Sequence, residues 1–117
     1  MRKTGVLAAL AALAQVNRLD VFRLLVEAGP DGMPAGSLAN ALKLAPNALT
    51  FHLDRLREAG LITVRRDGRS MIYAAEFDQM NALIGYLTEN CCQGRAEECA
   101  PALRKTGVRA TRKKEAV

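Results

Sequence analysis

The chain has 117 residues and a formal net charge of +5, and half of its residues are hydrophobic. This length suffices for one domain with a modest core and excludes a multidomain protein. The longest apolar run, residues 6–14, is too short to cross a bilayer, and the amphipathic pattern after it shows no cleavage-like break. We therefore expect a cytoplasmic protein with no membrane partner.

The positive charge is concentrated at the C-terminal end. Residues 104–117 carry six Lys or Arg against one Glu, which accounts for the whole net charge. In the rest of the chain, residues 54–69 are mildly basic and residues 76–98 are acidic. This separation is typical of a protein with one nucleic-acid face and a distinct regulatory region.

Apolar residues at helical spacing predict two helices in the first part of the chain, over residues 4–15 and 17–28. Asn17 is the expected N-cap of the second helix. The Gly-Pro-Asp-Gly segment at 29–32 then breaks the pattern before a short third helix.

A fourth helix is predicted from Pro46, since proline is tolerated in the first helical turn. Leu49, Leu53 and Leu56 form its core face, and Gly60 is expected to end it in the left-handed conformation. The short third helix, a tight turn and this fourth helix together are typical of a helix-turn-helix.

A β-hairpin and a fifth helix complete the predicted elements. Apolar and polar residues alternate on both sides of Asp67-Gly68, a strong two-residue turn signal. The fifth helix is expected to end at Gly94 and carries a narrow apolar seam of the kind that pairs helices: Phe77, Met80, Ile84, Leu87 and Cys91. We expect residues 1–94 to form the DNA-binding and dimerisation domain, and residues 95–117 a flexible tail that carries Cys99 and a basic end.

The face of the fourth helix opposite its leucines carries groups that can read DNA. It consists of Asn47, Ala48, Thr50, Phe51 and Asp54. Asn, Thr and Asp side chains can hydrogen-bond base edges, and Phe51 can contact a thymine methyl group. Three arginines crowd the hairpin tip and are suited to phosphates: Arg65, Arg66 and Arg69. The alternative, a solvated helix face beside a charged hairpin, leaves an exposed phenylalanine unexplained.

These residues resemble the ArsR family of small winged-helix repressors. The likeness lies in Thr50-Phe51-His52-Leu53, in residues 56–61, in Arg66-Asp67-Gly68-Arg69 and in Tyr73. It implies a mainly α fold with a small β-hairpin, the winged helix-turn-helix. It also implies a homodimer joined through the first and last helices. Such a dimer binds double-stranded operator DNA, is released by a metal or metalloid, and is not an enzyme.

Two known metal sites of that family are missing from this sequence. The third-helix Cys-Val-Cys of arsenical repressors is replaced here by Pro34-Ala35-Gly36, and residues 77–90 contain no His for a zinc site on the last helix. Cys91, Cys92 and Cys99 instead resemble the C-terminal Cys-Cys…Cys set of arsenite-sensing members. The sequence therefore predicts arsenite or antimonite as inducer and no constitutive cofactor.

The chemistry of the cysteines agrees with that expectation. Their odd number and adjacency favour reduced thiols over a disulfide framework. Three thiolates suit a soft ion of low coordination number, whereas structural zinc requires four ligands. Adjacent helical side chains point about 100° apart, so Cys91 and Cys92 converge only where the helix unwinds.

Other readings stay open. Cadmium, lead or thiol oxidation could control the same fold through the same cysteines. A small thiol enzyme such as an arsenate reductase is a weaker reading, since no cysteine lies in a phosphate-binding loop. A helical interaction module would not need the basic hairpin. His52 is expected to be half-buried and hydrogen-bonded rather than a metal ligand.

Overall fold

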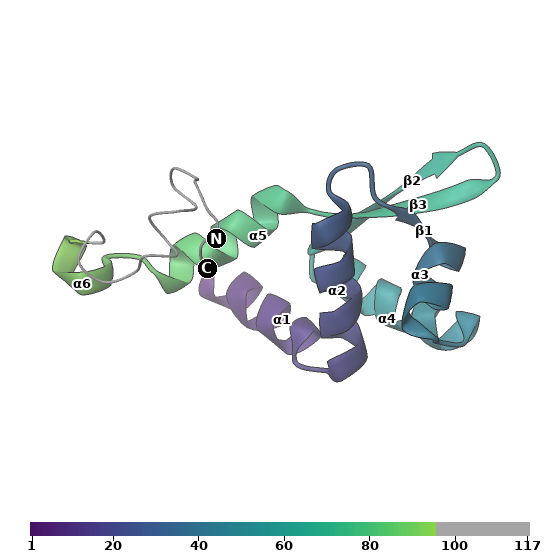
Figure 1. Ribbon diagram of the computed structural model, residues 1–117. Helices are drawn as coiled ribbons and strands as arrows, with labels where there is room; N and C mark the ends of the chain where they lie inside the picture. The colour runs from purple at the N-terminus through teal and green to yellow at the C-terminus, as the bar shows by residue number, and fades with distance from the viewer. Residues whose placement is uncertain (96–117) are drawn as a thin grey trace, which may run out of the picture. The chain divides into compact units, whose positions relative to one another are not determined.

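The structure, a computed structural model, describes residues 1–95 (Figure 1). The chain divides into two units, Met1–Tyr86 and a second that begins at Leu87. The first unit contains most of the helices and the sheet, and it holds the predicted reading face and wing. The second unit holds the cysteines.

Helices α1 (Lys3–Leu13) and α2 (Val16–Ala28) form the first part of the core. Gln15 caps α2, because its side chain accepts a hydrogen bond of 2.9 Å from the backbone N–H of Arg18. The prediction of Asn17 as N-cap was therefore wrong by two residues. No single helix among residues 1–95 is long and apolar enough to cross a membrane; α1 and α2 pass that test only together, and they bend by 103° at their junction.

Helices α3 (Ala35–Leu42) and α4 (Pro46–Glu58) form the predicted helix-turn-helix. Lys43 ends α3 in the left-handed conformation. The expected core face of α4 is confirmed, since Leu49, Leu53 and Leu56 are each at most 1% exposed. Gly60 follows α4 with φ +78°, as predicted.

The sheet has three strands in the order β1-β3-β2, all antiparallel. The predicted hairpin consists of β2 (Ile62–Asp67) and β3 (Ser70–Ala75). The third strand, β1 (Met33–Pro34), was not predicted, because two residues are too few to show an alternating pattern.

The hairpin turn lies one residue further along than predicted. Asp67 pairs with Ser70, so Gly68 and Arg69 occupy the two central positions of the turn. Gly68 has φ +64° at the first of these positions, as a type II′ turn requires. The turn is therefore centred on Gly68-Arg69 rather than on the expected Asp67-Gly68, and Arg69 lies at the tip of the hairpin.

Helix α5 (Phe77–Leu87) is shorter than the sequence indicated. It ends at Leu87, so the predicted seam does not continue to Cys91, and Gly94 does not end it. A short segment, α6 (Cys91–Gly94), follows, in which Cys92 and Gln93 have left-handed backbone angles. A run of apolar spacing alone cannot reveal such a departure from helical geometry.

The core of the first unit draws on every helix from α1 to α5 and on the sheet. Its most deeply buried large side chains are leucines and one valine: Val21, Leu25, Leu38, Leu49, Leu53, Leu56 and Leu61. Three of these leucines belong to α4, so the core fixes the rotation of that helix about its own axis. The opposite face of α4 is consequently turned to solvent.

Candidate nucleic-acid interface

All five predicted reading residues of α4 lie on its solvent face. Asn47, Ala48, Thr50, Phe51 and Asp54 are exposed, and Phe51 is 52% exposed although it is a large apolar side chain. The 3.6-residue repeat places them on the side away from the buried leucines. A helix presented in this way has the form that enters the major groove in helix-turn-helix proteins.

Local hydrogen bonds set what the first turns of α4 offer to a base edge. The Thr50 hydroxyl donates to the carbonyl oxygen of Pro46 at 2.9 Å, so its lone pairs remain as acceptors for another partner. Asn47 Oδ1 accepts from the backbone N–H of Ala48 at 2.9 Å, which leaves the Asn47 amide NH₂ as donor. Asn47 is thus suited to acceptor groups of bases, and Thr50 to a donor or to a thymine methyl group.

Two arginines of α4 that were not among the predicted site residues also lie on this face. Arg55 Nη1 is 3.3 Å from Glu58 Oε1, and Arg57 Nη1 is 3.7 Å from Asp54 Oδ1. Both arginine side chains are about half exposed, at 49% and 48%. Their spacing of three residues from acidic partners was the signal that could have placed them here.

The wing arginines are exposed, and one of them is anchored. Arg65, Arg66 and Arg69 all lie on the hairpin, which projects past the helices in Figure 1. Arg65 Nη2 donates to the backbone carbonyl of Asp31 at 2.8 Å, which ties the wing to the loop before β1. Arg66 lies opposite Met71 on β3. Arg66 and Arg69 therefore present their charge on the strand and at the tip of the wing.

His52 differs from the expectation. It is buried, at 8% exposed, and its Nδ1 has no hydrogen-bond partner among the described residues. Burial lowers the pKa of the imidazole below its usual 6.5, and the positive charge of Arg18 lowers it further. The predicted half-buried, hydrogen-bonded histidine is corrected to a buried, neutral one that packs its ring edge-on to Phe51.

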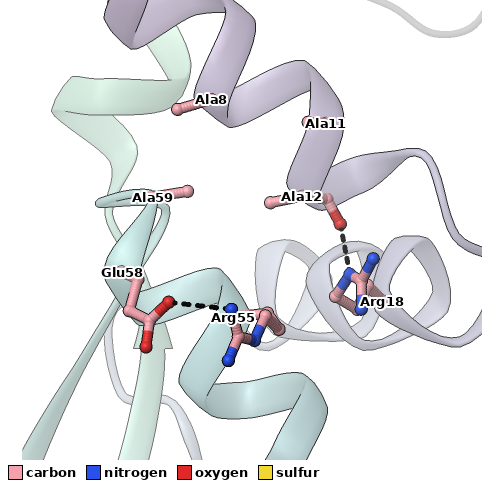
Figure 2. Close-up of a pocket in the computed structure, with 7 residues that line it drawn as sticks. All are labelled: Ala8, Ala11, Ala12, Arg18, Arg55, Glu58 and Ala59. Carbon is pink, nitrogen blue, oxygen red and sulfur yellow. Dashed lines mark hydrogen bonds and ion pairs between the residues drawn. The ribbon is translucent and has the colours of Figure 1, made fainter.

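A small open groove lies between α1, the start of α2 and the end of α4 (Figure 2). Its volume is about 290 Å³, and it is lined by four alanines and three charged side chains: Ala8, Ala11, Ala12, Arg18, Arg55, Glu58 and Ala59. Arg18 Nε donates to the carbonyl of Ala12 at 2.7 Å. The groove therefore extends from Arg55, at the edge of the reading face, to α1 and α2.

The cysteines lie in the second unit. Cys91 and Cys92 are half-buried with their sulfur atoms 3.5 Å apart, and the left-handed backbone of Cys92 supplies the departure from helical geometry that this approach requires. Cys92 is in the disulfide-bonded state, in contrast to the expected reduced thiols. Cys99 lies outside the described residues. Within residues 1–95 no group of three or more His, Cys, Asp or Glu side chains is placed to hold a metal ion.

The chain is similar in sequence to known regulators. A helix-turn-helix domain family matches residues 13–65. The HTH-type transcriptional regulator YgaV of Escherichia coli is 33% identical, covering 73% of this chain and 84% of that protein. The transcriptional activator HlyU of Vibrio cholerae is 30% identical over 72% and 75%, respectively. The nodulation protein NolR of Rhizobium meliloti is 32% identical over 68% of this chain and 63% of its own length.

Solved structures agree with these sequence relatives. An ArsR-like transcriptional regulator from Rhodococcus has a TM-score of 0.67 at 23% identity and covers 92% of this chain and 96% of its own. Reduced HlyU from Vibrio cholerae has a TM-score of 0.61 at 28% identity, covering 77% and 92%. A homodimeric winged helix-turn-helix domain from Mycobacterium bovis has a TM-score of 0.61 at 20% identity, covering 84% and 86%. The chain therefore belongs to a family of helix-turn-helix transcriptional regulators, and it has the winged-helix fold of an ArsR-like regulator.

Proposed function

We propose that the protein is a homodimeric repressor that binds a two-fold symmetric operator and leaves it when arsenite binds Cys91, Cys92 and Cys99. The observation that carries the sensing part is the pair of sulfur atoms 3.5 Å apart in Cys91 and Cys92. The DNA-binding part is supported by the exposed face of α4 beside the three wing arginines.

The sulfur pair suits one shared soft ion. Two sulfurs bound to one tetrahedral ion at about 2.3 Å each lie roughly 3.8 Å apart. The separation of 3.5 Å is close to this value. Cys92 is disulfide-bonded in this structure, so it must be reduced before it can bind the ion. Arsenic(III) takes three sulfur ligands in a pyramid, and Cys99 would be the third. In this step As(OH)3 exchanges its three hydroxides for three thiolates, and each thiol proton leaves with a hydroxide as water, so three waters and no net proton are released.

Dimerisation is supported by apolar side chains left exposed on α1 and α5. Leu7 and Leu10 of α1 are 58% and 38% exposed, and Ile84 of α5 is 43% exposed. Apolar residues in such numbers on two helices of a small unit indicate an interface with a partner. The homodimeric winged-helix domain from Mycobacterium bovis supports the same assembly. Two copies would present two α4 helices to two half-sites.

A second candidate, control by thiol oxidation, is favoured by the disulfide-bonded state of Cys92. HlyU, a relative, has been solved in a form named reduced. In this case two thiols lose two protons and two electrons to an oxidant such as hydrogen peroxide, which becomes water, and a disulfide forms. The same segment would change shape without any bound metalloid.

A gel shift on the DNA upstream of the protein's own gene separates the two candidates. Reduced protein is titrated with arsenite, antimonite, cadmium and lead, and separately with hydrogen peroxide followed by dithiothreitol. The proposal expects release by arsenite under reducing conditions. A hundredfold release requires about 2.7 kcal/mol of differential binding. Release by peroxide alone, reversed by dithiothreitol, would establish the redox candidate instead.

Variants of the cysteines complete this test. Each of Cys91→Ser, Cys92→Ser and Cys99→Ser should bind DNA as well as the wild type and respond less to arsenite. Loss of Cys99 should have the smallest effect, because the sulfur pair of Cys91 and Cys92 remains. A triple variant that still releases DNA with arsenite would contradict the sensor, and one that no longer binds DNA would make the cysteines structural. Because HlyU is named an activator, a reporter assay tests the direction of control. The proposed repressor predicts that expression rises on deletion of the gene, whereas an activator predicts that it falls.

A further inference from the structure

The guanidinium group of Arg55 lies over the ring of Phe51 on the exposed face of α4. Arg55 Cζ is 5.1 Å from the ring centroid, which is within cation–π distance. The two residues are four apart, so the helix places their side chains on adjacent turns of one face. Phe51 is otherwise 52% exposed. The exposed ring is therefore contacted by Arg55 and, edge-on, by the ring of His52.

Arg55 also has an acidic partner on the same helix. Glu58 Oε1 lies 3.3 Å from Arg55 Nη1. Attraction to Glu58 limits the positions that the guanidinium takes while it lies over Phe51.

We infer that Arg55 is a positioning residue that fixes the Phe51 ring for contact with a thymine methyl group. The inference rests on the proposed role of α4 as the reading helix. An exposed phenylalanine can occupy more than one rotamer, and ordering it on binding costs free energy. A ring fixed before binding avoids that cost and meets a methyl group at one place. Arg55 thus contributes to sequence preference without itself reading a base.

The test removes single methyl groups from DNA. A duplex that the protein selects from random sequences is remade with each thymine replaced in turn by deoxyuridine, which lacks only the C5 methyl. For the wild type, one position in each half-site should bind about fourfold more weakly, the ratio equivalent to about 0.8 kcal/mol for one buried methyl-sized group. Phe51→Leu should reduce this ratio, because a smaller side chain makes less contact.

Arg55→Lys keeps the charge but loses the planar guanidinium that stacks on a ring. The thymine-to-deoxyuridine ratio should fall from about fourfold towards one, with the salt dependence of binding unchanged. Glu58→Gln should give an intermediate ratio, since it weakens the attraction that limits the positions of Arg55. The side chains of Arg55 and Glu58 are 49% and 64% exposed, so both variants should fold. Equal thermal midpoints for the variants and the wild type would verify this.

Arg57→Lys is the matched control, because it makes the same exchange on the same helix at an arginine that pairs with Asp54. It should keep the methyl ratio. The inference is overturned if Arg55→Lys also keeps the ratio. This includes the case in which Arg55→Lys loses affinity equally for both duplexes, as expected if the guanidinium contacts a phosphate. A wild type without any methyl-sensitive thymine overturns it as well. Failure of the wild type to select any duplex would instead contradict the proposed function.

Discussion

His52 is buried on the inner side of α4 with an unpartnered Nδ1, and this makes the folded state sensitive to acid. Its pKa is lowered from 6.5 by burial and by Arg18, so below pH 6.5 the unfolded chain binds a proton that the folded protein excludes. The histidine therefore costs no stability above that pH, and stability falls as the pH drops from 6.5 towards the folded pKa.

Thermal unfolding followed from about pH 7.5 to about pH 5.5 should show this loss, since most carboxylates titrate below that range. His52→Leu removes the titrating group and should flatten the profile over the same range. Equal slopes for both proteins would show that other groups cause the pH dependence. As the single histidine of the chain, His52 also gives an imidazole NMR signal that reports its protonation directly.

Variants that lose a base contact and variants that lose a phosphate contact should differ in how they bind selected and unrelated DNA. Thr50→Ala should weaken binding to the selected sequence by about 1–3 kcal/mol if its lone pairs or methyl group meet a base, while binding to unrelated DNA stays the same. Arg66→Ala should weaken binding to all sequences and lower the salt slope by about one. Fluorescence anisotropy with both duplexes at several salt concentrations measures the two effects. Unchanged affinity in both variants would reject the assigned face.

At the scale of single residues, the sequence predicted which side chains of α4 are exposed but not how they pair. Their exposure follows from the helical period, because burial of the leucines turns the opposite face of the helix to solvent. The placement of Arg55 over Phe51 depends on rotamers, which a spacing rule does not specify. The burial of His52 depends on how α2 packs against α4, and no local pattern records that packing. The cap at Gln15 likewise depends on backbone angles at the end of α1.

The segment between α2 and α3 makes a close approach that only glycine permits. Gly32 has φ +73°, and an added Cβ would overlap the carbonyl oxygen of Tyr73 on β3. Gly32→Ala should therefore lower the free energy of unfolding by more than about 2 kcal/mol, through both strain and displacement of β1. Chemical denaturation would measure this loss.

Gly29→Ala is the matched control for this prediction. Gly29 also has a positive φ, of +79°, but nothing lies within 4 Å of an added Cβ. Only the conformational penalty remains, about 1–3 kcal/mol, because φ +79° with ψ −167° is a backbone region that is essentially reserved for glycine. Equal losses in the two variants would mean that the contact with Tyr73 is relieved by a small shift of the strand.

At the scale of elements, the helices and the hairpin were predictable, and their ends were less so. Periodic apolar residues identify α1 to α5 because each helix must bury one face. The end of α5 at Leu87 was missed, because the apolar spacing continues to Cys91 while the backbone leaves the helix. Strand β1 was missed because its two residues are defined by pairing with Tyr73 and Ile72 rather than by their own pattern.

The proposed dimer can be tested at the scale of the whole molecule. Ile84→Asp would bury a charge if α5 lies in the interface, and it should produce monomers in analytical ultracentrifugation. Leu19→Asp is the matched control, because Leu19 on α2 has the same exposure of 43% but lies outside the proposed interface. Monomers should also bind operator DNA far more weakly, since they hold one half-site. An intact dimer in Ile84→Asp, or monomers in both variants, would reject the interface.

The bond from Arg65 to the Asp31 carbonyl has a consequence for the operator itself. It links the hairpin to the loop that leads through β1 into α3, so the wing and the helix-turn-helix are held at a set separation. A wing that moves freely relative to the helix-turn-helix could adjust to a changed spacing between its two sets of DNA contacts, whereas a wing held by this hydrogen bond cannot. Insertion of one base pair between the bases under α4 and the phosphates under Arg66 and Arg69 should therefore abolish one set of contacts. Arg65→Ala removes this hydrogen bond, so it should make the protein more tolerant of that insertion. It should also lower the affinity for an operator of natural spacing.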